Sequence, residues 1–200
     1  MKRIRIAALQ KMVFDLSQSL IRMFLLSLIS VLIIERIKPP GINGMSSNVA
    51  KDVADGPHHS FWHGFLNLFL SVSIEEILFR IIPFLLFLGF IYILKIKYDK
   101  GNCWMIGICS AISFGLLHGN YLNIFIQGVA GLVLWNMMMV TFATFRWEKK
   151  WLMITLSFLA VILTHFIFDA IIIYKVRLII IPALLNLYLI GNKYKWEKML

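Results

Sequence analysis

Long apolar runs constrain the fold of this chain more than any other feature. Soluble proteins do not repeat apolar runs of about 15 to 20 residues, whereas a helix that crosses a bilayer needs about 20 such residues. Hydrophobic residues make up 60% of the sequence and charged residues only 15%. We therefore expect an all-α, polytopic transmembrane helical bundle that forms a single membrane domain over residues 1–200. Its six expected segments are 20–34, 61–94, 104–117, 122–145, 152–174 and 178–190.

The basic residues indicate topology rather than nucleic-acid binding. The net charge is +10, but the 20 Lys and Arg residues are scattered over short connections and do not form one stripe. They cluster near the N-terminus, at 95–100, at 146–150 and at 193–198. Connections rich in Lys and Arg stay on the cytoplasmic side of a membrane, and six segments put all four clusters on one side. We therefore expect a multi-pass protein of the cell membrane, which contacts the lipid bilayer. We do not expect it to bind nucleic acid.

The run at 61–94 allows two interpretations, which are one broken helix that crosses once and a tight hairpin that crosses twice. A hairpin would place three of the four basic clusters outside, so the charge pattern favours a single crossing. Pro83 is compatible with this, because neighbouring helices can satisfy the backbone groups that a proline frees. The sequence therefore predicts one long helix that is kinked just after Arg80.

Two adjacent carboxylates lie inside this run. Glu75 and Glu76 occur in the sequence SVSIEEILFR, which ends at Arg80. An ionised carboxylate near the bilayer centre costs about 2.5–3.5 kcal/mol on insertion scales, so acidic residues in a span mark functional sites. Residues four apart share a face of a helix, which aligns Glu76 with Arg80. The sequence thus predicts a functional site at this point of the long helix.

Two further segments carry ionisable residues at a similar depth. His118 ends an apolar run in the sequence FGLLH, and His165 and Asp169 lie in the sequence THFIFD. The spacing of four puts His165 and Asp169 on one face, and it puts Phe114 one turn before His118. Counted at about 1.5 Å per residue, these groups and Glu75 fall at comparable heights in the membrane. We expect them to face one cavity.

Glutamate, histidine and aspartate side chains in a desolvated cavity suit the activation of water. A carboxylate beside cations can act as a general base, and two histidines can donate hydrogen bonds to a developing oxyanion. The same groups could instead bind zinc, because two histidines and a carboxylate form a common ligand set. No H-E-x-x-H spacing occurs, so we expect a site without metal or cofactor, with zinc as the alternative. For either histidine taken alone, an interhelical hydrogen bond is a further alternative.

Three motifs follow one another on successive apolar segments: EExxxR at 75–80, FxxxH at 114–118 and HxxxD at 165–169. In this order they resemble the motifs of the CPBP family of intramembrane endopeptidases. That family groups type II CAAX prenyl endopeptidases with bacterial bacteriocin-processing and immunity proteins. The resemblance covers about residues 61–175, which would form the catalytic core. It implies hydrolysis of a peptide bond in a membrane-associated peptide or lipidated protein, in a bacterial plasma membrane.

The resemblance also implies a role for each site residue. The first glutamate and the second-motif histidine would activate water, and the third motif would form the oxyanion site. The implied catalytic residues are Glu75, His118, His165 and Asp169, and the supporting residues are Glu76 and Arg80. Two positions differ from many relatives. Ile81 stands where many relatives have glycine, and the third motif ends in aspartate where eukaryotic relatives have asparagine. The charge pattern puts the site near the non-cytoplasmic face, whereas the resemblance favours cytoplasmic access.

Two other classes of function fit an intramembrane acid and histidine set. The first is a non-catalytic immunity or interaction protein, whose helical bundle binds a bacteriocin or another membrane partner. The second is an ion- or proton-coupled carrier, since intramembrane acids also mark ion paths. The sequence contains no internal repeat, which argues against a carrier. The leading expectation is therefore a glutamic-type intramembrane endopeptidase, with the immunity or interaction protein as its alternative.

Overall fold

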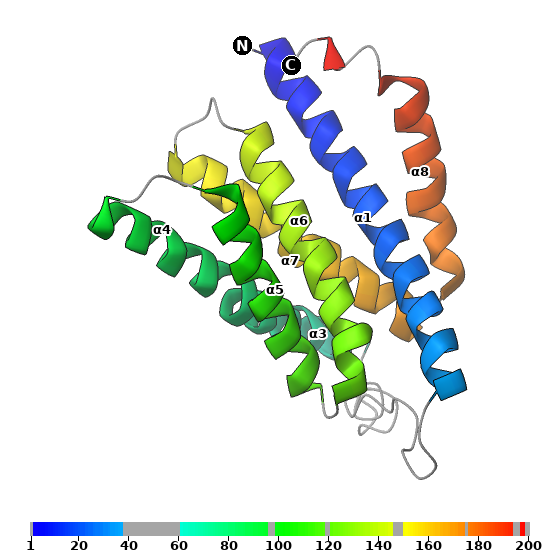
Figure 1. The fold of residues 1–200 in the computed structure, drawn as a ribbon. Helices are drawn as coiled ribbons and strands as arrows, with labels where there is room; N and C mark the ends of the chain where they lie inside the picture. The colour runs from blue at the N-terminus through cyan, green and yellow to red at the C-terminus, as the bar shows by residue number, and fades with distance from the viewer. Residues whose placement is uncertain are drawn as a thin grey trace. The chain divides into compact units, whose positions relative to one another are not determined.

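The computed structural model describes residues 2–37, 61–95, 99–118, 121–145, 150–174, 176–193 and 197–198. All elements in this part of the chain are helical and none is a strand, which confirms the all-α class (Figure 1). The α-helices are α1 Lys2–Ile37, α3 Phe61–Glu76, α4 Ile82–Leu94, α5 Lys100–Leu117, α6 Gln127–Thr144, α7 Lys150–Tyr174 and α8 Ile180–Gly191. Three short elements join them, namely the π-helix η1 Ile77–Ile81 and the 3₁₀-helices η2 Tyr121–Phe125 and η3 Val176–Ile179.

Among the described residues, four helical stretches are long and apolar enough to cross a membrane. They are Ile6–Ile34, Gly64–Leu94, Leu122–Thr144 and Trp151–Ile173. Two further apolar helices, Gly101–Leu117 and Arg177–Gly191, are shorter than a membrane span requires. The structure thus supports a membrane protein and does not confirm the expected count of six segments. The apolar helix near the N-terminus also begins well before the expected start at Leu20.

Several sequence-based expectations fall on residues outside the described ranges. The connection between the expected segments 20–34 and 61–94 is one of them. The basic residues within 96–98, 146–149 and 194–196 are others. The proposed sidedness of the basic clusters therefore stays a prediction.

The chain divides into two compact units, and each is described by itself. The first unit comprises Met1–Phe24 and Val133–Leu200, and the second comprises Leu25–Leu132. The single membrane domain expected over 1–200 stays a prediction.

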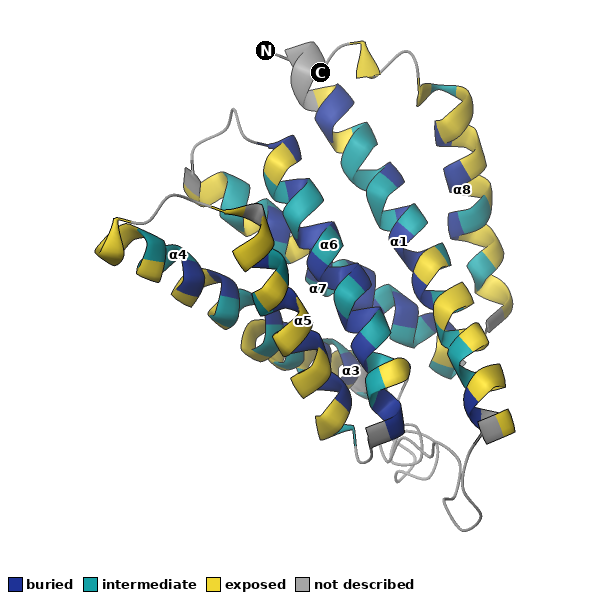
Figure 2. Cartoon of the chain, viewed as in Figure 1, coloured by how far each residue is buried: buried dark blue, intermediate teal, exposed yellow. Residues whose placement is uncertain are grey.

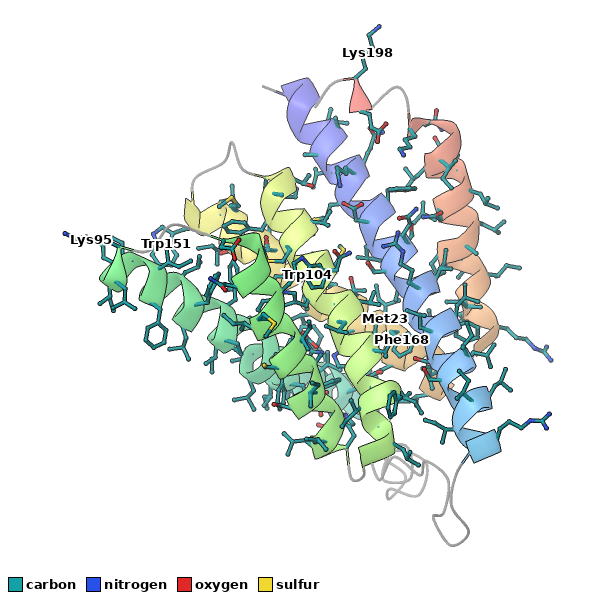
Figure 3. The ribbon with its side chains drawn as sticks, viewed as in Figure 1. Met23, Lys95, Trp104, Trp151, Phe168 and Lys198 are labelled. Atoms are coloured by element: carbon teal, nitrogen blue, oxygen red, sulfur yellow. The ribbon has the colours of Figure 1, made fainter. Side chains whose placement is uncertain are left out.

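In the second unit, α3, η1 and α4 form one uninterrupted helical stretch from Phe61 to Leu94. This is the single long helix that the charge pattern favours over a hairpin. The stretch ends where Lys95 adopts a left-handed backbone, with φ of 51°, and its N–H donates to Ile91 O. The Lys95 side chain extends away from the end of α4 (Figure 3). Helix α5 begins at an N-cap, because the Asp99 carboxylate accepts a hydrogen bond from Asn102 N at 3.1 Å.

Apolar side chains cover the surface of the helices, as a lipid environment requires. Exposed residues cover most of α4 and α8, whereas buried ones predominate along α6 (Figure 2). Many of the exposed side chains are large and apolar, such as Phe90 and Ile93 on α4 and Leu187 on α8. Contiguous apolar surface of this kind marks contact with lipid or with another membrane helix. The burial pattern therefore agrees with the membrane assignment from hydropathy.

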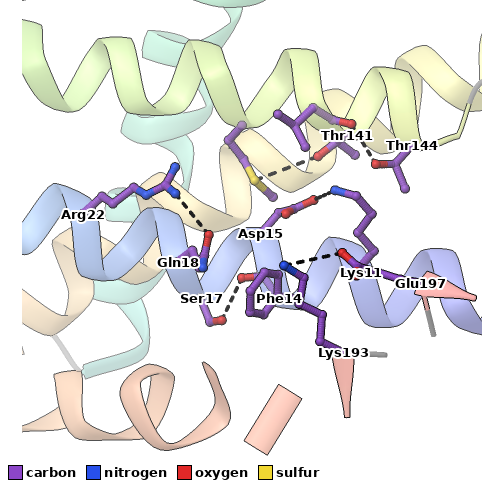
Figure 4. A network of polar contacts seen from close by, with 12 residues as sticks. Lys11, Phe14, Asp15, Ser17, Gln18, Arg22, Thr141, Thr144, Lys193 and Glu197 are labelled. Carbon is purple, nitrogen blue, oxygen red and sulfur yellow. Dashed lines mark hydrogen bonds and ion pairs between the residues drawn. The ribbon is translucent and has the colours of Figure 1, made fainter. Parts of the chain in front are cut away.

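Polar contacts support the first unit. Lys11 Nζ lies 2.5 Å from Asp15 Oδ2, and Arg22 donates to Gln18 at 3.2 Å, both within α1 (Figure 4). The buried Asn186 of α8 donates to the hydroxyl of Ser17 on α1 at 2.9 Å. Burying a polar side chain costs free energy unless a hydrogen-bond partner replaces the lost water. The bond between Asn186 and Ser17 therefore joins α1 to α8 within this unit.

Candidate active site

The helix that carries Glu75 and Glu76 changes its geometry immediately after them. Residues Ile77–Ile81 form a π-helix, in which the N–H of Ile82 donates to Ile77 O, five residues back. Such turns are rare and occur frequently at functional sites. The sequence predicted a proline kink just after Arg80 but not a π-helical turn. Pro83 lies in the first turn of α4, directly after the π-helical turn.

Glu76 and Arg80 form an ion pair across this turn. Arg80 Nη1 lies 3.1 Å from Glu76 Oε1, and both side chains are buried, at 1% and 0% exposure. This confirms the alignment that the spacing of four predicts. Burying two charges costs several kcal/mol each unless they are paired, so this pair would be hard to retain without a role. The neighbouring Glu75 is only partly buried and also interacts electrostatically with Arg80.

Phe114 connects this ion pair to His118. The Arg80 guanidinium carbon lies 4.1 Å from the centroid of the Phe114 ring, which is a cation–π geometry. The same ring packs edge-on against Phe79 at 5.4 Å and against the imidazole of His118 at 4.5 Å. The second unit therefore brings together Glu76, Arg80 and His118, through a phenylalanine that the second motif contains.

The hydrogen bonds of His118 define which of its nitrogens can react. His118 is the C-cap of α5, and its Nδ1 lies 2.7 Å from Phe114 O. A carbonyl oxygen only accepts hydrogen bonds, so Nδ1 carries the proton and the neutral ring keeps a lone pair on Nε2. Asn123 of η2 donates to His118 O at 2.5 Å, which fixes the end of α5. His118 Nε2 is therefore the atom that could accept a proton from water or bind a metal.

Two glycines allow the helices to approach each other closely around this site. A Cβ on Gly131 of α6 would lie 2.6 Å from Arg80 Nη2, and a Cβ on Gly115 of α5 would lie 2.6 Å from Ile124 Cα. Distances this short do not occur for real Cβ atoms. Gly131 thus leaves the space in which the guanidinium of Arg80 lies. The sequence analysis missed both glycines, because only the fold shows what lies opposite them.

The third motif lies in the first unit, on α7. His165 Nε2 lies 3.3 Å from Asp169 Oδ2, which confirms that the two side chains share a face. His165 is buried, whereas Asp169 is 28% exposed. An Asp that bonds one ring nitrogen fixes the orientation and tautomer of the imidazole. The expectation that this pair shares a cavity with Glu75 and His118 stays a prediction.

No described group of three or more His, Cys, Asp and Glu side chains is arranged to bind a metal ion. Cys103 is buried and Cys109 exposed, and no disulfide joins these two described residues. The chain matches no protein-family model, no curated protein and no solved structure. The functional assignment therefore depends on the site residues alone.

Proposed function

We propose that this protein is a glutamic-type intramembrane endopeptidase, as its resemblance to the CPBP family implies. The observation that supports it best is the buried pair of Glu76 and Arg80, packed through the Phe114 ring against His118. A charged pair buried in an apolar helix is costly and is retained where it serves a function. The substrate would be a membrane-associated or lipidated peptide that enters from the bilayer.

In this mechanism Glu75 is the general base, because the resemblance gives this role to the first glutamate and Glu75 is less buried than Glu76. Glu75 and His118 Nε2 together remove a proton from water, and the resulting hydroxide attacks the carbonyl carbon of the scissile bond. The proton then passes to the leaving amine as the C–N bond breaks. By resemblance, His165 and Asp169 stabilise the oxyanion. Glu76 and Arg80 hold the helix turn that carries Glu75.

The test is hydrolysis of lipidated and unlipidated membrane peptides by the purified chain in detergent. Replacing Glu75 with Gln, or His118 with Ala, should lower the rate by about 10²–10⁴-fold, the usual contribution of a general base. The exposed Glu197, which pairs with Lys193, provides the matched control Glu197→Gln, whose rate should not change. A zinc chelator should leave the wild-type rate unchanged, and inhibition would favour the zinc alternative.

The immunity or interaction role is separated from catalysis by the same variants. If the chain protects cells from a bacteriocin, and protection survives alanine at Glu75, His118 and His165, the protein acts by binding. Full proteolytic activity of both Glu75→Gln and His118→Ala would overturn the catalytic assignment.

A further inference from the structure

A hydrogen bond from α5 reaches the π-helical turn beside Arg80. The hydroxyl of Ser110, which is buried, donates to the backbone carbonyl of Phe79. In an α-helix this carbonyl would accept from the N–H four residues later, which belongs to Pro83 and does not exist. An unsatisfied carbonyl is costly in hydrocarbon, because no water is available to replace the donor. Ser110 thus supplies a donor in place of the one that Pro83 cannot provide.

The position of Ser110 also links this bond to the rest of the candidate site. Ser110 and Phe114 are four residues apart and share a face of α5. From that face, α5 contacts two successive residues of the turn: Ser110 and the Phe114 ring contact Phe79, and the same ring packs on Arg80. One further turn along α5 leads to His118. The hydroxyl therefore fixes the turn that follows the acidic residues against the helix that ends in the candidate catalytic histidine.

We propose that Ser110 is a positioning residue, which holds the π-helical turn in the geometry that presents the glutamates and Arg80 toward His118. Ser110 touches no reacting atom and acts through the carbonyl of Phe79. The catalytic consequence rests on the proposed function, whereas the structural consequence does not. The two can therefore be tested separately on the full chain in detergent.

The structural test is a double-mutant cycle between Ser110 and Pro83. Replacing Ser110 with Ala removes the donor, so backbone amides of residues 77–86 should exchange with deuterium about tenfold faster, as locally destabilised helices do. Replacing Pro83 with Ala restores the N–H of residue 83, so Ser110→Ala should have little further effect in that background. Ser113→Ala is the matched control, because the exposed hydroxyl of Ser113 donates to Cys109 O within its own helix at 2.9 Å.

The catalytic test uses the same four variants and the peptide hydrolysis assay. Ser110→Ala should lower kcat by about tenfold to a hundredfold with little change in KM, because small displacements of catalytic groups reduce rate more than binding. The added Pro83→Ala change should recover part of that loss, because it returns a backbone N–H that Phe79 O can accept from. Ser113→Ala should leave both parameters unchanged.

The outcomes distinguish this inference from the proposed function. If no peptide is hydrolysed by the wild-type chain but the exchange cycle is non-additive, the proposed function fails and the role of Ser110 in the turn stands. If Ser110→Ala and Ser113→Ala have equal exchange rates, or if the cycle is additive, the inference about Ser110 is wrong. A loss of kcat that Pro83→Ala does not restore would show that Ser110 does not act through the carbonyl of Phe79.

Discussion

Two intrahelical ion pairs with the same spacing of four lie in different environments. In α1, Lys11 and Asp15 are 2.5 Å apart, with side chains 26% and 15% exposed. In the long helix, Glu76 and Arg80 are 3.1 Å apart and almost entirely buried. The shorter pair is the more exposed one, so distance does not rank their importance. The side chains of Lys11 and Asp15 remain partly exposed, whereas the guanidinium of Arg80 packs on the ring of Phe114.

The comparison teaches that burial, more than proximity, identifies an ion pair with a function. An exposed pair contributes little, since water and salt screen its charges. In a fully buried pair, removing one partner strongly destabilises the protein, because the other charge stays buried without compensation. The following substitutions test this difference by equilibrium unfolding in detergent, in order of expected effect.

The largest effect should come from Glu76. Replacing it with Ala leaves Arg80 buried without its carboxylate, and we expect a loss of about 3–5 kcal/mol in the free energy of unfolding. The double replacement of Glu76 with Leu and Arg80 with Met should recover most of that loss, because no buried charge remains. A Glu76→Ala variant as stable as the wild type would show that the buried pair does not stabilise the fold.

An intermediate effect should come from Gly131. Its replacement with Ala places a Cβ 2.6 Å from Arg80 Nη2, and the guanidinium has little free space because it is buried against Phe114. We expect a loss of about 1–3 kcal/mol, as for other overpacked sites. Gly89 is the matched control, since nothing lies within 4 Å of its added Cβ and alanine favours the helix by up to about 1 kcal/mol. Equal effects at the two glycines would contradict the close approach.

The smallest effect should come from the pair in α1. Replacing Lys11 with Met, or Asp15 with Asn, should cost less than about 1 kcal/mol, because both side chains are partly exposed. The effect should also shrink as salt is added, whereas that of Glu76→Ala should not. If Asp15→Asn destabilised the protein as much as Glu76→Ala, burial would not be the distinguishing property.

Sequence periodicity predicted what depends on one helix alone. The pairs formed by Glu76 with Arg80, Phe114 with His118, and His165 with Asp169 all follow from residues four apart on a helix. The all-α class and the single long helix at 61–94 followed from apolar length and charge. Local spacing is enough for these features, because each partner lies on the same element.

Features that join two elements could not be predicted. The hydrogen bond to the π-helical turn comes from Ser110 of α5, and the space for Arg80 depends on Gly131 of α6. Which of the two adjacent glutamates is buried was also open, since neighbours on a helix differ in direction by about 100°. The expected count of six crossings is not confirmed, because Gly101–Leu117 and Arg177–Gly191 are apolar but short within the described residues.

The π-helical turn also changes the phase of the long helix. Buried residues recur every four positions along it, at Leu68, Val72, Glu76, Arg80 and Phe84. In a regular α-helix each step of four overshoots a full rotation by about 40°, so such a stripe would wind progressively around the axis. The turn at 77–81 closes its rings over five residues, which takes up part of this winding. The buried stripe of α3 thus continues into α4 on nearly the same side of the helix. The ion pair of Glu76 and Arg80 lies at the turn where this direction is corrected.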